Sequence, residues 1–200
     1  MVCWKKRIRG LVLASTSPRR KEILSGMHID FSVEVADIGE ESRFFEKTNF
    51  KNAIKKLARE KGKIISEKYP DAPVLSADTI VVLGSKVLGK PQNADDAKIT
   101  LKTLSGKKHQ VYTAVSLSCK NAGFNETVLE KTDVRFRDID DEELEEYLKS
   151  AVFLDKAGSY GIQEEGGFFV EKINGDYSNV VGLPVCATIK LLKKYQVSIK

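Results

Sequence analysis

An aspartate lies inside a run of apolar residues that reads as a buried strand. Residues 73–83, PVLSADTIVVL, form a nearly continuous apolar stretch of the kind found in the middle of a sheet, and Asp78 interrupts it. A buried carboxylate without compensation costs several kcal/mol. We therefore expect Asp78 to have a metal ion, a cationic partner or a role in chemistry. An ion pair with a structural arginine is the plainer interpretation.

A lysine interrupts the apolar stripe of a predicted helix over residues 50–65, FKNAIKKLAREKGKII. At about 100° per residue, Lys61 falls in the middle of that stripe. Either its ammonium group reaches past the core into solvent, or it points from the core face into a cleft. The apolar members of the stripe are Phe50, Ile54, Leu57, Ile64 and Ile65.

Two arginines follow a predicted junction between a strand and a helix, in ASTSPRRKE (14–22). Residues 10–15 predict a buried strand, and Ser17 is the expected cap of a helix that begins at Pro18 and runs to about Gly26. The free N–H groups of a helix start attract anions, and Arg19 and Arg20 add positive charge there. Simple exposure of the helix start is the plainer alternative.

Three loops carry further polar candidates. Lys90 lies between Gly89 and a proline, and Gln163 lies in a glycine-rich loop that lacks the spacing of a P-loop. Glu40, or its neighbour Glu41, follows a strand and offers a carboxylate to a divalent ion, although a solvated turn also explains it. Cations and carboxylates together at the ends of elements suit a phosphate-rich substrate held with a divalent metal.

Other kinds of chemistry have little support in the sequence. The two histidines, His28 and His109, are not near a serine or cysteine nucleophile motif. Three well-separated cysteines predict a reduced, cytoplasmic protein without a zinc site or a disulfide framework. No apolar run reaches the roughly 20 residues that span a bilayer, so we expect no membrane partner. The net charge of +5 is the one feature that favours binding of DNA or RNA, and we expect no nucleic-acid partner.

Strand patterns alternate with helix patterns along all 200 residues, without a repeat or a separable linker. We predict one α/β domain over residues 1–200, with a mixed sheet because hairpins and crossovers coexist. The further elements expected are strands over 31–36, 109–119, 126–136 and 166–174, a hairpin turn at 121–123, and helices that begin after Asn93, after Asp140 and at Pro184.

Eight segments in order resemble the Maf family of nucleoside triphosphate pyrophosphatases. The resemblance implies a two-lobed fold, similar to that of inosine triphosphate pyrophosphatases, with a central mixed sheet flanked by helices and a cleft between lobes, in a group where homodimers are common. The segments are LVLASTSPRRKEIL (11–24), LAREK (57–61), SADTIVV (76–82), LGKP (88–91), LSGKKHQVYTAV (104–115), DVRFR (133–137), DKAGSYGIQEEGG (155–167) and INGDYSNVVGLP (173–184).

The resemblance also implies an activity and roles for residues. The family hydrolyses a nucleoside triphosphate to the monophosphate and pyrophosphate with a divalent cation, Mg²⁺ or Mn²⁺. Asp78 matches the catalytic base, and Glu40 matches the second acidic residue, which would share the metal with Asp78. The pattern SPRR, ADT and GIQ resembles the subfamily that acts on dTTP and UTP. The matches to phosphate-handling residues are Ser15, Arg20, Lys61 and Lys90, and those to residues tied to base choice are Arg19, Thr79 and Gln163.

Two alternatives stay open. One is a broader pyrophosphatase that also hydrolyses modified pyrimidine nucleotides such as pseudo-UTP or 5-methyl-UTP. The other is a regulatory binding protein in cell division, as the family's association with septum formation suggests, with a vestigial nucleotide site. Buried charges without a ligand are costly, which argues against pure binding.

Overall fold

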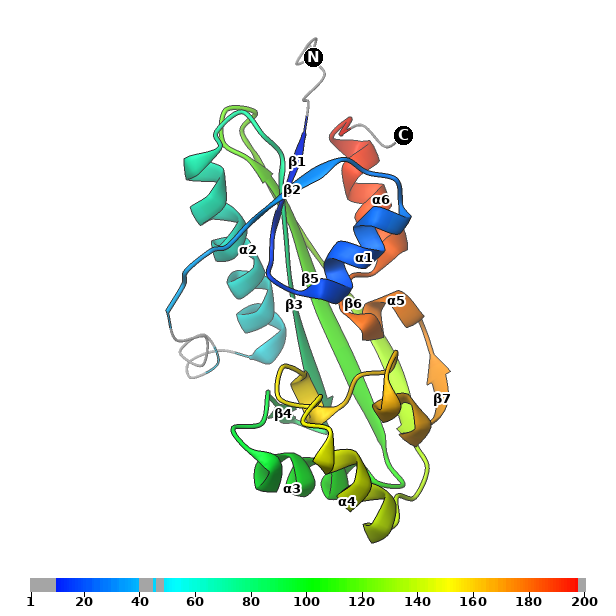
Figure 1. Cartoon of the computed structure of the whole chain (residues 1–200). Helices are drawn as coiled ribbons and strands as arrows, with labels where there is room; N and C mark the ends of the chain where they lie inside the picture. The colour runs from blue at the N-terminus through cyan, green and yellow to red at the C-terminus, as the bar shows by residue number, and fades with distance from the viewer. Residues whose placement is uncertain (1–9, 40–44, 46–48, 198–200) are drawn as a thin grey trace. The chain divides into compact units, whose positions relative to one another are not determined.

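The computed structural model describes residues 10–39, 45 and 49–197, which are drawn in colour in Figure 1. The chain divides into two compact units. The first unit contains the described residues up to Asp78, Thr113–Glu130, and the described residues from Gly182 onward. The second contains Thr79–Tyr112 and Lys131–Val181. Three long strands pass from one unit into the other, so each contributes one part to each unit.

The strands form a mixed sheet of seven in the order β2-β1-β3-β5-β6-β7, with β4 paired to β3. Strand β1 is parallel to both β2 and β3, whereas β4 is antiparallel to β3 and β7 is antiparallel to β6. The predicted α/β fold with a mixed sheet flanked by helices is confirmed. The strands are β1 (Leu11–Ala14), β2 (Phe31–Glu34), β3 (Val74–Leu83), β4 (Lys86–Leu88), β5 (Lys108–Cys119), β6 (Phe124–Phe136) and β7 (Val170–Asn174).

In the first unit, helices cover both faces of the strands because side chains alternate between the faces. Leu11 and Leu13 of β1 pack in a cluster with residues of α1 (Pro18–Gly26) and α6 (Val185–Lys194). Val12 and Ala14 face the other way and pack with Ile65 of α2 (Phe50–Lys68). Both faces of β1 are therefore buried, as the apolar run over 10–15 predicts.

In the second unit, one aromatic-rich core joins the remaining parts of the long strands to short helices. Phe136, Tyr160 and Phe169 pack edge-on or tilted against one another within it. The helix α3 (Ala94–Leu104) lies against α4 (Asp141–Lys149) and against the 3₁₀ turn η2. The other short elements of this unit are η2 (Ala157–Ser159), η3 (Glu165–Phe169) and α5 (Tyr177–Val181).

Several predicted boundaries need correction. The strand expected over 31–36 ends at Glu34, and the strand expected over 166–174 begins at Val170, because residues 165–169 form η3 instead. Ile64, expected on the buried stripe of α2, is 39% exposed. The caps at Asn93 and Asp140 are confirmed, since their side chains accept hydrogen bonds from the first turns of α3 and α4. Among the described helices, none is long and apolar enough to span a bilayer.

Candidate active site

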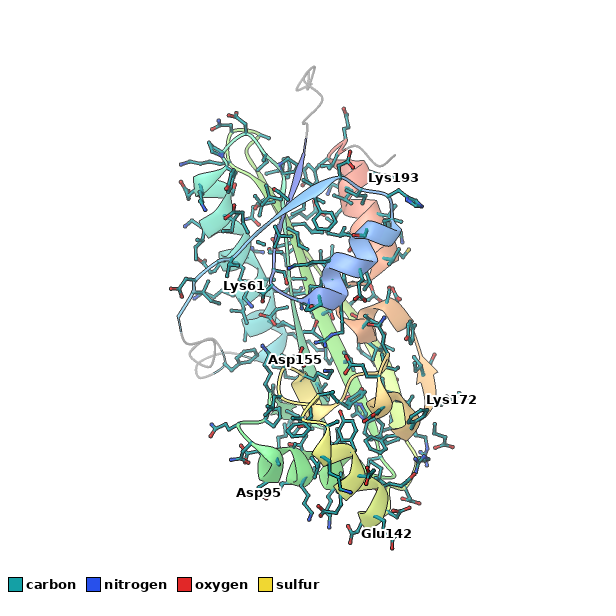
Figure 2. The ribbon with its side chains drawn as sticks, in the orientation of Figure 1. Lys61, Asp95, Glu142, Asp155, Lys172 and Lys193 are labelled. Carbon is teal, nitrogen blue, oxygen red and sulfur yellow. The ribbon has the colours of Figure 1, made fainter. Side chains whose placement is uncertain are left out.

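Lys61 and Asp78 form an ion pair inside the first unit. The Nζ of Lys61 donates to Oδ2 of Asp78 at 2.6 Å, and the two side chains are 15% and 13% exposed (Figure 2, where Lys61 is labelled on α2). The ammonium group of Lys61 therefore does not reach past the core into solvent, as one of its two interpretations required. Asp78 has the cationic partner that its position requires, and that partner is a lysine.

The face on which Asp78 lies follows from strand periodicity. Val74 packs with Ile65 of α2, and Ser76 donates a hydrogen bond to the carbonyl of Ala58, also in α2. Because alternate residues of a strand share a face, Asp78 lies on the side of β3 that α2 covers. The same helix therefore shields the carboxylate from solvent and supplies its partner.

Ser15 and Arg20 come together at the start of α1. The guanidinium group of Arg20 donates from Nη1 to Ser15 Oγ at 3.2 Å and from Nε to the carbonyl of Gly182 at 2.8 Å. The backbone N–H of Ser17 also donates to Ser15 Oγ, at 3.2 Å. Ser17 occupies the N-cap position of α1 as predicted, but within the described residues its side chain makes no capping hydrogen bond.

The register of the sheet relates Ser15 to Asp78. Strands β1 and β3 are parallel, with Leu13 opposite Leu75. Continued past the end of β1, this register places Ser15 at the level of Ala77, next to Asp78 in sequence. Ser15, just past the end of β1, and Asp78, in the middle of β3, thus lie at nearly the same level of two neighbouring parallel strands.

Three predicted site residues lie in the second unit. Thr79 follows Asp78 directly on β3, and Lys90 and Gln163 are exposed in loops. The backbone N–H of Gly158 donates to the carbonyl of Gly89 at 3.0 Å, so the loop with Lys90 is hydrogen-bonded to the start of the glycine-rich loop. Arg19 lies half-buried on α1 in the first unit. Glu40 and Glu41 lie outside the described residues.

A buried cation that the sequence patterns did not predict lies at the start of the glycine-rich loop. The side chain of Lys156 is 6% exposed, and its ammonium group binds the carbonyl of Val152 and the carboxylates of Asp155 and Glu164. Gly161 leaves room for it, because a Cβ there would lie 2.5 Å from Lys156 Cε. Lys156 directly precedes the three small residues Ala157, Gly158 and Ser159, and this was the available signal.

The histidine of the second unit is structural. His109 Nε2 lies 2.8 Å from the hydroxyl of Tyr160, and the ring stacks edge-on against Phe136. Burial lowers the pKa of His109 to about 4, and burial raises the pKa of Tyr160 above its ordinary value. His109 is therefore neutral near pH 7, in accord with the absence of a histidine-based nucleophile motif in the sequence.

A divalent metal such as Mg²⁺ requires oxygen ligands. The described residues hold no group of three or more His, Cys, Asp or Glu side chains that could bind an ion. Mg²⁺ is usually held by one or two carboxylates together with substrate phosphates and water, so a dedicated cluster is not required. The carboxylate of Asp78 is the kind of oxygen donor that such an ion takes, and the residues present fit a metal that binds together with the substrate.

Residues 10–195 match the family model for the Maf-like proteins. The chain belongs to the Maf family. Three bacterial relatives named dTTP/UTP pyrophosphatase cover nearly all of this Maf chain. The relative from Bacillus cereus (strain B4264) is 41% identical over 96% of this chain and 98% of its own. Those from Myxococcus xanthus (strain DK1622) and Hahella chejuensis are 45% and 44% identical, over 92% and 96% of this chain and 91% and 94% of their own.

Among solved structures, the Ham1 protein of Staphylococcus aureus is 13% identical to this Maf chain, with a TM-score of 0.46 over 64% of this chain and 72% of its own. A similarity at this level carries no argument about the site. The matches to the curated relatives, in contrast, extend across the sequence segments that contain Ser15, Lys61 and Asp78.

Proposed function

We propose that this Maf protein hydrolyses dTTP and UTP to the nucleoside monophosphate and pyrophosphate. The observation that carries the proposal is the Lys61–Asp78 pair, a carboxylate 13% exposed within a strand and bound to an ammonium group at 2.6 Å. Burying such a charged pair costs free energy, and a role in binding or chemistry would explain why it is kept. The choice of dTTP and UTP is supported by the names of relatives that are 41–45% identical over nearly the whole chain.

In the proposed reaction, a water oxygen attacks the α-phosphorus and the bond from that phosphorus to the α–β bridging oxygen breaks. Asp78 orients the water and accepts its proton, and pyrophosphate leaves with the bridging oxygen. Lys61 holds the carboxylate of Asp78 in place and offsets negative charge that develops on the phosphates. Each atom is then accounted for: one water adds across one phosphoanhydride bond.

The start of α1 is proposed to bind phosphate oxygens. The positive end of the helix dipole favours an anion, and Ser15 and Arg20 add a hydroxyl and a guanidinium group held by hydrogen bonds. Because the carbonyl of Gly182 and the hydroxyl of Ser15 hold Arg20 in one orientation, less conformational entropy is lost when a phosphate binds. Arg20 thus acts as a preorganised phosphate clamp.

A divalent cation, Mg²⁺ or Mn²⁺, is proposed as the cofactor, with Asp78 and Glu40 as its protein ligands. When bound, it supplies positive charge that stabilises the departing pyrophosphate. The chain's own cations share that task, since Lys61 lies beside Asp78 and Lys90 is proposed to bind phosphate. Activity is therefore expected to be lost on chelation and to return when the ion is restored.

The remaining residues are proposed to select the base. Arg19, Thr79 and Gln163 match the positions tied to base choice in the family, and polar side chains of these types can read the edge of a pyrimidine. We also propose that the protein acts in the cytoplasm, where its substrates are, and forms a homodimer as is common in its family.

The test is a panel of dTTP, UTP, CTP, ATP and GTP with Mg²⁺, extended to pseudo-UTP and 5-methyl-UTP, in which the products are identified. Monophosphate and pyrophosphate from dTTP and UTP, with little from the purine nucleotides, are expected. Equal turnover of the modified pyrimidines would establish the broader pyrophosphatase. Binding without turnover of any nucleotide by the folded protein would overturn the proposal and favour the regulatory alternative.

A further inference from the structure

One glycine lets α2 approach the sheet more closely than any other residue would allow. Gly62 is buried in α2, and a Cβ at this position would lie 2.8 Å from Oγ of Ser76 and 3.2 Å from Oγ of Ser118. Real Cβ atoms essentially never come within 3.0 Å of a heavy atom of a residue that is not their neighbour in the chain. Any side chain at position 62 would therefore push the helix and the strands apart or displace the serine hydroxyls.

The strand side of this contact is polar and closely fitted. Ser76 Oγ donates to the carbonyl of Ala58 at 2.7 Å, which lies one helical turn before Gly62. Both Ser76 and Ser118 are buried, and Ser118 Oγ has no hydrogen-bond partner among the described residues. The turn of α2 from Ala58 to Gly62 is therefore held to β3 by the hydrogen bond from Ser76. The absence of a side chain at Gly62 is what allows this turn to lie so close to the strand.

This contact directly flanks the ion pair. Lys61 precedes Gly62 on α2, and Ser76 precedes Asp78 by two residues on the same face of β3. The spacing between helix and strand at Gly62 and Ser76 therefore sets the distance that the Lys61 side chain must cover to reach Asp78. In the structure the side chain covers that distance and places Nζ 2.6 Å from Oδ2.

We infer that Gly62 and Ser76 are positioning residues, which act by holding the helix turn of Lys61 against the strand of Asp78. The inference rests on the proposed function for its kinetic readout, although not for its structural one. Neither residue touches the reacting atoms in this scheme. Both act through the alignment of the ammonium and the carboxylate, and a misplacement of about 1 Å in such a group can cost about 100-fold in rate.

The test is the series Gly62→Ala, Ser76→Ala and the double variant, measured for kcat and KM with dTTP. Gly62→Ala is expected to lower kcat by about 10- to 100-fold. In the double variant the nearest obstacle is gone, because the next contacts of the new Cβ are Ser118 Oγ at 3.2 Å and the Cβ at position 76 at 3.7 Å. The kcat of the double variant should therefore be within about threefold of the kcat of Ser76→Ala alone. This difference is smaller than the about 10- to 100-fold loss expected for Gly62→Ala.

A matched control is Gly26→Ala, at the end of α1, where a Cβ meets nothing within 4 Å. This control should retain wild-type kinetics. Alanine forms helices better than glycine, so helix propensity alone predicts that Gly62→Ala is the more stable protein. A lower melting temperature with rescue by Ser76→Ala therefore reports the steric contact and not the propensity.

A readout without turnover separates this inference from the proposed function. The interaction free energy between Lys61 and Asp78 is obtained from a double-mutant cycle, in which thermal unfolding is measured for Lys61→Met, Asp78→Asn and the double variant. The cycle is carried out twice, once with the native glycine at position 62 and once with Gly62→Ala. Weaker coupling in the alanine background supports the positioning role even if no nucleotide is hydrolysed. Unchanged coupling, or wild-type kcat in Gly62→Ala, overturns it.

Discussion

Replacing Asp78 by asparagine removes one negative charge and keeps the size and shape of the side chain. The variant can no longer accept a proton from water, although its amide oxygen can still accept the hydrogen bond from Lys61. A positioned general base contributes about 10²- to 10⁴-fold. We therefore expect kcat for dTTP to fall by at least about 100-fold, which corresponds to roughly 3 kcal/mol in the activation free energy.

The structure also bounds the effect of this change on stability. Removing one partner of a fully buried ion pair costs about 3–5 kcal/mol, and breaking a surface pair costs about 0–1 kcal/mol. The side chains of Lys61 and Asp78 are 15% and 13% exposed, and asparagine retains an acceptor. We expect a loss of about 1–2 kcal/mol of unfolding free energy, well below the roughly 5–15 kcal/mol of a typical domain. The variant is therefore expected to stay folded, and a loss of its turnover would not be caused by unfolding.

The assay follows pyrophosphate and monophosphate release together with thermal unfolding of the same sample. The matched control is Glu34→Gln, since Glu34 also pairs with a lysine of α2, Lys68, at 2.8 Å, and accepts a hydrogen bond from the hydroxyl of Tyr69. The Lys68 side chain is 61% exposed. This control makes the same chemical change in a solvated pair and should leave kcat unaltered.

Near-wild-type turnover by the folded Asp78→Asn protein would refute the assignment of Asp78 as base. An equal loss of activity in Glu34→Gln would show that any broken pair on α2 disturbs the enzyme, and would refute a specific role for Asp78. A large loss confined to Asp78→Asn, with a small change in melting temperature, is the expected result.

Three further predictions concern other parts of the chain. Arg20→Lys should raise KM for dTTP about tenfold or more, with less effect on kcat, and steady-state kinetics measure both. The reason is that an ammonium group cannot keep the hydrogen bond to Ser15 and also offer two parallel donors to a phosphate. Since burial lowers the pKa of His109 to about 4 from 6.5, the unfolded chain binds the proton first, and the free energy of unfolding should fall by up to about 3 kcal/mol as the pH drops from 6.5 to 4. His109→Gln should flatten that part of the pH–stability curve, and an unchanged slope would contradict the burial argument. Lys156→Met should cost about 1–3 kcal/mol in chemical denaturation by removing the ammonium that binds Glu164, and no change would mean that this buried cation stabilises nothing.

Local chemistry in the sequence was enough to predict most elements of this fold. Each of the signals that predicted them acts over a few residues, and the structure confirms these elements. The signals are Pro18 at a helix start, Asn93 and Asp140 as caps, and the period-two alternation on both sides of the turn between β5 and β6. The same reasoning required a partner for Asp78, because burial of a carboxylate is costly wherever the strand lies. These conclusions depend on neighbours in sequence and needed no tertiary information.

Tertiary structure decided which partners meet. Lys61 and Asp78 are 17 residues apart and Arg20 and Gly182 are 162 apart, and no local pattern encodes either contact. Local reasoning placed Ser17 correctly at the N-cap of α1, but capping preferences do not predict that the Arg20 guanidinium group binds the hydroxyl of Ser15. The sequence alone thus determined that a charge must be compensated within β3. The close packing of α2 against that strand decided which cation compensates it, because contacts between distant segments depend on how the elements pack and not on their own periodicity.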